Sequence, residues 1–260
     1  MGLTISLAQF QIELGKPDAN LSRLRDLLPE AARRGSQILL LPELWTTGYD
    51  LTNAAQLARV DRSLLADISQ LAAQYNMVIS GSMLLGADSK VFNTFVYQTP
   101  DGTEPVTYAK VHLFRLMDEH RWLAPGDHLQ QVRATWGSAG LSICYDLRFP
   151  EMYRQYALAG VELFLISAEW PAARVSHWQT LLRARAIENQ CFIAATNACR
   201  VTGGETFGGR SAIISPWGDV LVEGAPDLPD LLTAAIDLDQ VSQARERIPI
   251  LQDRRPDLYY

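Results

Sequence analysis

The chain has 260 residues, a formal net charge of −6 and a sequence isoelectric point near 5.3. Its hydrophobic fraction of 48% excludes a disordered chain, and its acidic balance without a basic stripe argues against nucleic acid as a partner. No apolar stretch is long enough to span a bilayer and the first ten residues do not resemble a signal peptide, so we expect a cytoplasmic protein without a membrane partner.

Strand and helix patterns alternate along the chain. In the first part of the chain we expect strand 3–12, helix 21–34 capped by residues 18–20, strand 37–41, helix 61–75 and strand 77–85, followed by strands 91–98 and 107–113 as a hairpin. In the middle we expect strands 129–135 and 139–143, helix 150–159, strand 161–167, helix 174–190 and strand 191–198. The last part contains a hairpin around 215–219, strand 231–237 and a short helix at 244–247. Without a linker or a short repeat, this order predicts one domain over residues 1–260, a sandwich of two sheets with helices outside.

Three cysteines, with no C-x-x-C pair, are too few for a disulfide framework and fit a reducing compartment. Cys191 and Cys199 lie in an apolar strand region and are expected in the core. Because no histidine or carboxylate cluster has zinc spacing, we expect no metal site.

Cys144 ends the apolar run 139–143 and is followed by the sequence Tyr-Asp-Leu-Arg-Phe-Pro-Glu. A strand that stops at a cysteine and turns into a helix exposes the sulfur on a bend, where backbone N–H groups face the group under attack. The pattern predicts a nucleophile, although a buried structural cysteine would have the same local sequence.

Two further segments place charged residues beside apolar strands. Glu43 follows the apolar strand 37–41, and it is either a general base or a solvated loop residue. Lys110 lies within the expected strand 107–113, and it is either an exposed lysine of an edge strand or a buried cation with an anion beside it. With Cys144, these residues supply the nucleophile, base and cation that acyl transfer from an amide requires.

The three segments occur in the order of a known set of motifs. Residues 41–43 (LPE), 108–114 (YAKVHLF) and 144–151 (CYDLRFPE) resemble the signature blocks of the nitrilase, or carbon–nitrogen hydrolase, superfamily. Further matches extend over nearly the whole chain, at 168–171 and 177–190 to the bacterial omega-amidase-like branch and at 207–211 and 215–218 to the later part of the family pattern.

This resemblance implies an α/β fold, a four-layer αββα sandwich of two mixed sheets, and a homodimer paired through the outer helices. It implies that Cys144 is the nucleophile, Glu43 the general base and Lys110 the oxyanion stabiliser, with the backbone N–H of Tyr145 as a second donor. Glu119, which precedes a Pro-Gly-Asp loop, fits the place of the family's second glutamate and would orient Lys110; the alternative is a surface charge. No cofactor is needed.

The implied substrate is a small ω-amide of a dicarboxylic acid, such as 2-oxoglutaramate, hydrolysed to the acid and ammonia through a thioester. Another linear amide or an N-carbamoyl compound is the alternative. Arg148 can bind a substrate carboxylate, or it can pair with Glu151 or Asp146 in a structural role.

Other residues in the same blocks are candidates for the pocket. Tyr49 and Trp170 can wall a narrow pocket, although most aromatic residues fill core. Glu169 is a candidate to face the pocket, where an acid would disfavour a substrate carboxylate. The alternative of a different class is a binding or assembly module that only retains the cavity. Such a module would normally have lost Cys144, Glu43 or Lys110, and this chain has all three.

Overall fold

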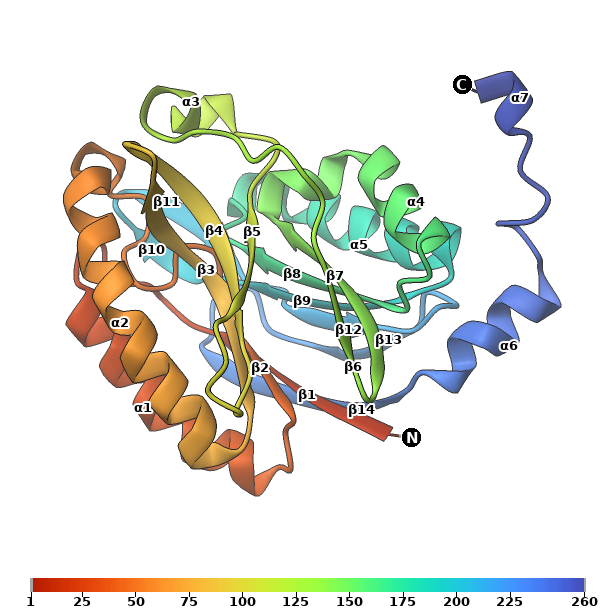
Figure 1. The fold of residues 1–260 in the computed structure, drawn as a ribbon, viewed down its shortest axis with the longest axis horizontal. Coiled ribbons are helices and arrows are strands. Elements are labelled where there is room, and N and C mark those ends of the chain that lie inside the picture. The colour runs from red at the N-terminus through yellow and green to blue at the C-terminus, as the bar shows by residue number, and fades with distance from the viewer. Residues whose placement is uncertain (1, 260) are drawn as a thin grey trace.

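The apolar runs of the chain form two six-stranded sheets that pack face to face, with helices on their outer sides (Figure 1). The computed structural model describes residues 2–259. The first sheet contains, side by side, β14 (Asp230–Asp237), β1 (Gly2–Gln9), β2 (Ile38–Leu40), β3 (Val78–Ala87), β4 (Lys90–Gln98) and β5 (Val106–Ala109). The second contains β6 (Gln131–Ala134), β7 (Gly137–Ile143), β8 (Leu163–Ala168), β9 (Phe192–Asn197), β12 (Ala212–Ile214) and β13 (Val220–Glu223).

The two sheets share one pattern of strand pairing. In each, three neighbouring strands run parallel, β1-β2-β3 in the first sheet and β7-β8-β9 in the second, and the outer pairs are antiparallel. Each parallel step crosses over through a helix: α1 (Pro17–Arg33), α2 (Ala54–Tyr75), α4 (Pro150–Leu158) and α5 (Val175–Asn189). The expected αββα sandwich of two mixed sheets is therefore confirmed, and β2 and β8 occupy equivalent central places.

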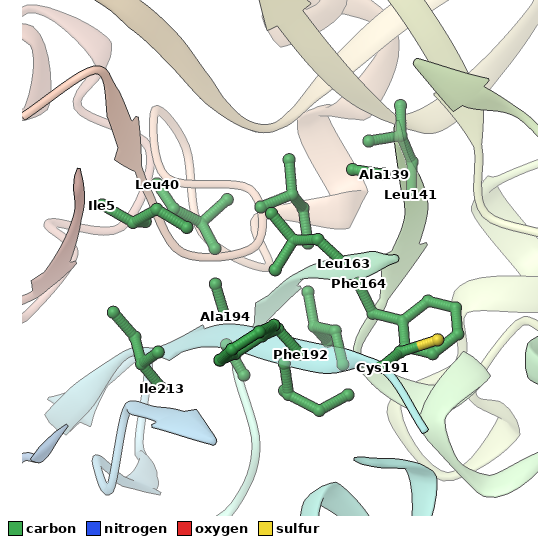
Figure 2. Close-up of a cluster of buried hydrophobic side chains, with 14 of the residues drawn as sticks. Ile5, Leu40, Ala139, Leu141, Leu163, Phe164, Cys191, Phe192, Ala194 and Ile213 are labelled. Atoms are coloured by element: carbon green, nitrogen blue, oxygen red, sulfur yellow. The ribbon is translucent and has the colours of Figure 1, made fainter. Parts of the chain in front are cut away.

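The core fills the space between the sheets and beneath the helices. Side chains from both sheets form one buried cluster, including Ile5, Leu40, Leu141, Leu163 and Phe192 (Figure 2). A second cluster joins the apolar faces of α1 and α2 to the outer side of the first sheet. This burial on both faces explains why the parallel strands read as unbroken apolar runs.

Two helices begin earlier than the sequence predicted. α1 starts at Pro17, a residue suited to the first helical turn, so residues 18–20 lie inside the helix and are not its cap. The buried Asn20 instead donates to the carbonyl oxygens of Glu13 and Thr46, at 2.8 and 2.7 Å. α2 starts at Ala54, seven residues before the predicted position, directly after a short 3-10 turn at Leu51–Asn53.

The sequence also missed some strand pairings. β3 and β4 form a hairpin whose turn residues, Asp88 and Ser89, both have positive φ of 49° and 63°. A separate two-stranded hairpin, β10 (Cys199–Thr202) with β11 (Glu205–Gly208), was not predicted. The remaining helices are α3 (Glu119–Trp122), α6 (Asp239–Arg247) and α7 (Pro256–Tyr259), and the C-terminal segment with α7 extends away from the sandwich (Figure 1).

Within residues 2–259, no helix combines the length and the apolar character that crossing a bilayer requires.

Candidate active site

Four chain segments bring polar residues together where strands of both sheets end. Glu43 comes shortly after β2, Lys110 directly after β5, Cys144 directly after β7 and Glu169 directly after β8. The last three therefore lie at strand ends, and the prediction that Lys110 lies within a strand is wrong because β5 ends at Ala109. The side chains of Glu43, Lys110 and Glu169 are fully buried, and Cys144 is 5% exposed.

Lys110 lies between two carboxylates. Its Nζ is 2.7 Å from Oε1 of Glu43 and 2.6 Å from Oε1 of Glu119, which is also fully buried and therefore not a surface charge. Burial alone would lower the pKa of Lys110, but the negative charges of Glu119 and Glu43 outweigh it and hold the pKa well above its usual value. The amine is therefore a fixed cation at any ordinary pH.

Glu43 receives three hydrogen bonds from groups that the fold holds in place. Its Oε1 accepts from Lys110 and, at 2.8 Å, from Nδ2 of Asn93, and its Oε2 accepts from the backbone N–H of Glu169 at 2.9 Å. The next residue, Leu44, has a φ of 43°, a strained value for a bulky side chain. These three donors hold the carboxyl group of Glu43 in one orientation, as a positioned proton acceptor requires.

Glu119 and Tyr49 form the far side of the Lys110 cluster. The Tyr49 hydroxyl donates to Oε1 of Glu119 at 2.6 Å, and the backbone N–H of Phe114 donates to Oε2 at 2.8 Å. Burial and the charge of Glu119 raise the pKa of Tyr49 well above its usual value, so the phenol stays protonated as a donor. Tyr49, expected in the pocket wall, is thus engaged by Glu119, which is fixed in turn against Lys110.

Cys144 begins the 3-10 turn Cys144–Arg148 with a φ of 45°, the left-handed conformation of a sharp strand-to-helix bend. Its Sγ lies 3.9 Å from the carbonyl oxygen of Glu169. Burial, and then the charge of Glu43, raise the pKa of Cys144 well above its usual value, while Lys110 offsets only part of this effect. The resting sulfur is therefore a thiol, which needs a base before it can attack.

Asp146 ties the turn that carries Cys144 to the loop that carries Lys110. Its buried carboxylate accepts from the Tyr108 hydroxyl at 2.8 Å, the backbone N–H of His112 at 3.1 Å and the backbone N–H of Ile143 at 3.0 Å. Nδ1 of His112 lies 2.8 Å from the same carboxylate. These donors satisfy the carboxylate of Asp146. The alternative ion pair between Asp146 and Arg148 is not formed.

A narrow hollow of about 10 Å³, room for about one water molecule, opens at Cys144. Its lining combines aromatic rings with two guanidinium groups: Phe114, Cys144, Tyr145, Arg148, Trp170, Pro171 and Arg174. Arg148 lies over the Trp170 ring, 4.6 Å from its centre, and Arg174 lies 5.7 Å from the centre of the Phe114 ring. Among the described residues no ion pair joins Arg148 to Glu151, so this structural alternative is not formed either.

Arg174 is a site residue that the sequence did not reveal. It ends the 3-10 turn Ala172–Arg174, and its carbonyl oxygen accepts a hydrogen bond from Nε1 of Trp170 at 2.8 Å. The only signal in the sequence was its place between the AEWP block and the start of α5. Trp170 also lines the hollow at Cys144, and its backbone N–H donates to Asn197 Oδ1 at 2.6 Å.

Within the described part of the chain, no group of three or more His, Cys, Asp or Glu side chains is arranged to hold a metal ion. The three cysteines, Cys144, Cys191 and Cys199, are all free thiols.

A two-sheet sandwich with a buried cysteine, glutamate and lysine at one end defines a hydrolase that uses a thiol. Residues 4–246 match the carbon–nitrogen hydrolase family, and the chain belongs to that family. It is 42% identical to the 2-oxoglutaramate amidase of Bacillus subtilis (strain 168), over all of both chains.

Solved structures agree. A CN-hydrolase superfamily protein of Xanthomonas campestris with an arsenic adduct in its active site superposes with a TM-score of 0.92 at 34% identity, covering 98% of both chains. A mutant amidase of Nesterenkonia sp. AN1 that has added acrylamide at its active-site cysteine superposes with a TM-score of 0.88 at 28% identity, covering 99% of this chain and 98% of the other.

Proposed function

We propose that the protein is an amidase in which Cys144 is the nucleophile, Glu43 the general base and Lys110 the cation that stabilises the oxyanion. The observation that carries the proposal is that three residues far apart in the sequence meet at one buried site. Lys110 and Glu43 form an ion pair of 2.7 Å, and the backbone of Glu169 borders both Glu43 and Sγ of Cys144. Acyl transfer from an amide needs a nucleophile, a proton acceptor and an electrostatic clamp, and this cluster supplies each.

The reaction follows from the protonation states of these groups. Glu43 takes the thiol proton of Cys144 as the sulfur attacks the amide carbon, and the Lys110 amine with the backbone N–H of Tyr145 holds the tetrahedral oxyanion. The C–N bond then breaks and the nitrogen takes the proton from Glu43. Ammonia departs, and the acyl group remains on Cys144 as a thioester. Glu43 next removes a proton from water as its oxygen attacks the thioester carbon. The C–S bond breaks, the acid leaves, and Glu43 returns the proton to the sulfur of Cys144.

Glu119 supports the reaction through Lys110. Held by Tyr49 and the backbone of Phe114, it fixes the amine from the side opposite Glu43. Gly126 of the Pro-Gly-Asp loop adds a backbone hydrogen bond of 2.9 Å to the Lys110 carbonyl, and its backbone lies so close to Ala109 that no side chain would fit there. Contacts to both the side chain and the backbone of Lys110 thus fix its amine before substrate binds.

For the substrate, we propose a short ω-amide of a dicarboxylic acid, with 2-oxoglutaramate as the best candidate. The guanidinium groups of Arg148 and Arg174, which line the narrow hollow at Cys144, suit the carboxylate at the far end of such a substrate. The relationship to a 2-oxoglutaramate amidase over the whole chain supports the same choice.

The test is ammonia release from a panel of amides that differ in their distal group. We expect 2-oxoglutaramate to be turned over faster than an uncharged amide of similar length and faster than N-carbamoyl acids. The variant Arg174→Gln should raise KM for 2-oxoglutaramate about 10- to 100-fold, the effect of losing one charge-assisted hydrogen bond, and leave the uncharged amide unchanged. An equal loss on both substrates would contradict a carboxylate site.

Loss of the nucleophile is the second test. Cys144→Ala should reduce ammonia release to background while its circular dichroism spectrum remains that of the wild type. Turnover by the folded variant would rule out the thiol mechanism. A module without catalysis would instead bind amides with no ammonia release from the wild-type protein, and its three cysteines would be alkylated equally slowly.

We propose further that the chain forms one domain and works in the cytoplasm as a homodimer. The free thiols of all three cysteines support a reducing compartment. Leu158 on α4 and Ile187 on α5, which are 45% and 49% exposed, offer apolar surface on the outer helices for a second copy.

A further inference from the structure

The two halves of the fold have the same strand pattern, and this pattern places Glu169 beside Glu43, the proposed base. β2 and β8 are the central parallel strands of their sheets, and the chain leaves them with Glu43 and Glu169. The two residues touch, since the backbone N–H of Glu169 donates to Oε2 of Glu43 at 2.9 Å. The carbonyl oxygen of Glu169 lies 3.9 Å from Sγ of Cys144, so this residue borders both the base and the nucleophile.

The carboxyl groups of the two glutamates have opposite surroundings. Glu43 accepts three hydrogen bonds, whereas no donor among the described residues reaches either carboxyl oxygen of Glu169. Glu169 is nevertheless fully buried. A buried polar group without a partner lowers stability, so its presence here needs a reason outside the fold itself.

Burial and the neighbouring charges both act on the protonation of Glu169. The charged groups that act on it are Glu43, from the loop after β2, and Lys110, from the loop after β5. Lys110 is already shared by Glu43 and Glu119, so an ionised Glu169 would add a third carboxylate to one amine. Burial first, and then the charge of Glu43, raise the pKa of Glu169 well above its usual value, and Lys110 opposes this shift only in part.

The reaction involves more hydrogens than Glu43 alone can bind. The amide nitrogen and, later, the attacking water each carry two hydrogens, whereas Glu43 receives one proton at a time. We propose that Glu169 is a catalytic residue that acts as a neutral carboxylic acid. The C=O oxygen of its side chain accepts a hydrogen bond from the second hydrogen of the departing nitrogen and later from that of the water. This inference rests on the proposed role of Glu43. It also implies that Glu169 does not repel a substrate carboxylate.

Two variants of similar size separate this role from a structural one. Glu169→Gln keeps a neutral side chain with a carbonyl oxygen, and its kcat should recover most of the loss that Glu169→Met shows. Glu169→Met removes the acceptor, and its kcat should fall about 10- to 100-fold with little change in KM, the effect of losing one hydrogen bond in the transition state. Its melting temperature should not fall, because an unpartnered polar group has been removed.

The outcomes are exclusive. A kcat for Glu169→Met equal to the wild type would overturn the proposal, since no hydrogen bond would then be at stake. A Glu169→Gln variant as slow as Glu169→Met would overturn it as well, because it would show that the group must ionise or transfer a proton. An inactive wild-type protein would instead contradict the amidase function itself.

Infrared spectroscopy tests the same claim without turnover. In the Cys144→Ala protein, the carbonyl stretch of a protonated carboxyl group should be present at pH 8 and should shift when the amide substrate binds. The band should be lost in the Cys144→Ala, Glu169→Gln double variant. Asp61, a second buried carboxyl group, is the matched control: burial raises its pKa to about 7, so its band should disappear on titration to pH 8. A Glu169 that lacks the band, or whose band ignores the amide, would refute the inference.

Discussion

Lys110 sets the charge balance at the scale of single residues. One buried amine forms ion pairs with two buried acids, Glu43 and Glu119, at 2.7 and 2.6 Å. Removing one partner of such a cluster leaves the other charges buried and uncompensated. The pairing therefore fixes the geometry of the site and makes it sensitive to substitution.

We expect Lys110→Met to lower the free energy of unfolding by about 3–5 kcal/mol, the cost of breaking a buried ion pair, and to abolish activity. Chemical denaturation at pH 7 measures the first effect. Lys90→Met, at an exposed position in the β3–β4 hairpin, is the control and should change stability by less than about 0.5 kcal/mol. Equal stability of the two variants would show that Lys110 is not needed to compensate its carboxylates.

Asp61 gives the stability of the protein a pH dependence. Its carboxylate accepts from the Thr46 hydroxyl and the backbone N–H of Leu84, both at 2.9 Å, but burial outweighs these bonds and raises the pKa of Asp61 from 3.8 to about 7. The folded state therefore retains a proton that the unfolded chain has lost. The resulting stability is full below pH 4 and declines as the pH rises to about 7.

The shift predicts that the wild type loses up to about 4 kcal/mol of unfolding free energy through Asp61 between pH 4 and pH 7. Asp61→Asn carries no such charge, so the difference in stability between variant and wild type should change over this pH range. Urea unfolding at several pH values measures it. A pH-independent difference between the two proteins would contradict the assigned shift.

At the scale of elements, the sequence predicted the segments whose pattern has one physical cause. Unbroken apolar runs predicted the strands that are buried on both faces. The sequence that follows Cys144 predicted the strand-to-helix turn. The sequence missed the start of α1, because the side chain of Asn20 makes tertiary hydrogen bonds in place of a cap. It missed Arg174, because only the folded chain brings that short turn to the hollow at Cys144.

The β3–β4 turn is another element that the sequence concealed. Its two residues, Asp88 and Ser89, adopt positive φ without the glycine that normally marks such a turn. Ser89→Gly should therefore raise the free energy of unfolding by about 0.5–1 kcal/mol, because glycine accepts this conformation without strain. Thermal unfolding measures the gain, and ammonia release should not change. A destabilised variant would show that the serine side chain outweighs the strain.

At the scale of the whole molecule, the two halves of the sandwich divide the site between them. The first half supplies Glu43, Lys110 and Glu119, and the second supplies Cys144 and Glu169. Hydrogen bonds between the sheets keep the halves in register, such as Ser167 Oγ to the carbonyl of Leu41 at 2.8 Å. Motifs in the sequence indicated the members of the site, but their mutual distances follow only from this packing.

The proposed dimer is also a property of the whole molecule. Ile187 on α5 is 49% exposed, and placing a charge there should oppose burial against a second copy. We expect Ile187→Glu to shift the protein from dimer to monomer in sedimentation velocity runs. Leu116→Glu, at a 79% exposed position in the 3-10 turn Arg115–Met117, should leave the dimer intact. A wild-type monomer at micromolar concentration would contradict the proposed assembly.

The mass of the acylated enzyme reports directly on the role of Cys144 as the nucleophile. Wild-type protein mixed with 2-oxoglutaramate and quenched in acid should gain the mass of the substrate less ammonia, and peptide mapping should place that mass on Cys144 alone. An adduct on another residue, or turnover of the amide with no thioester at Cys144 on any timescale of quenching, would contradict the account.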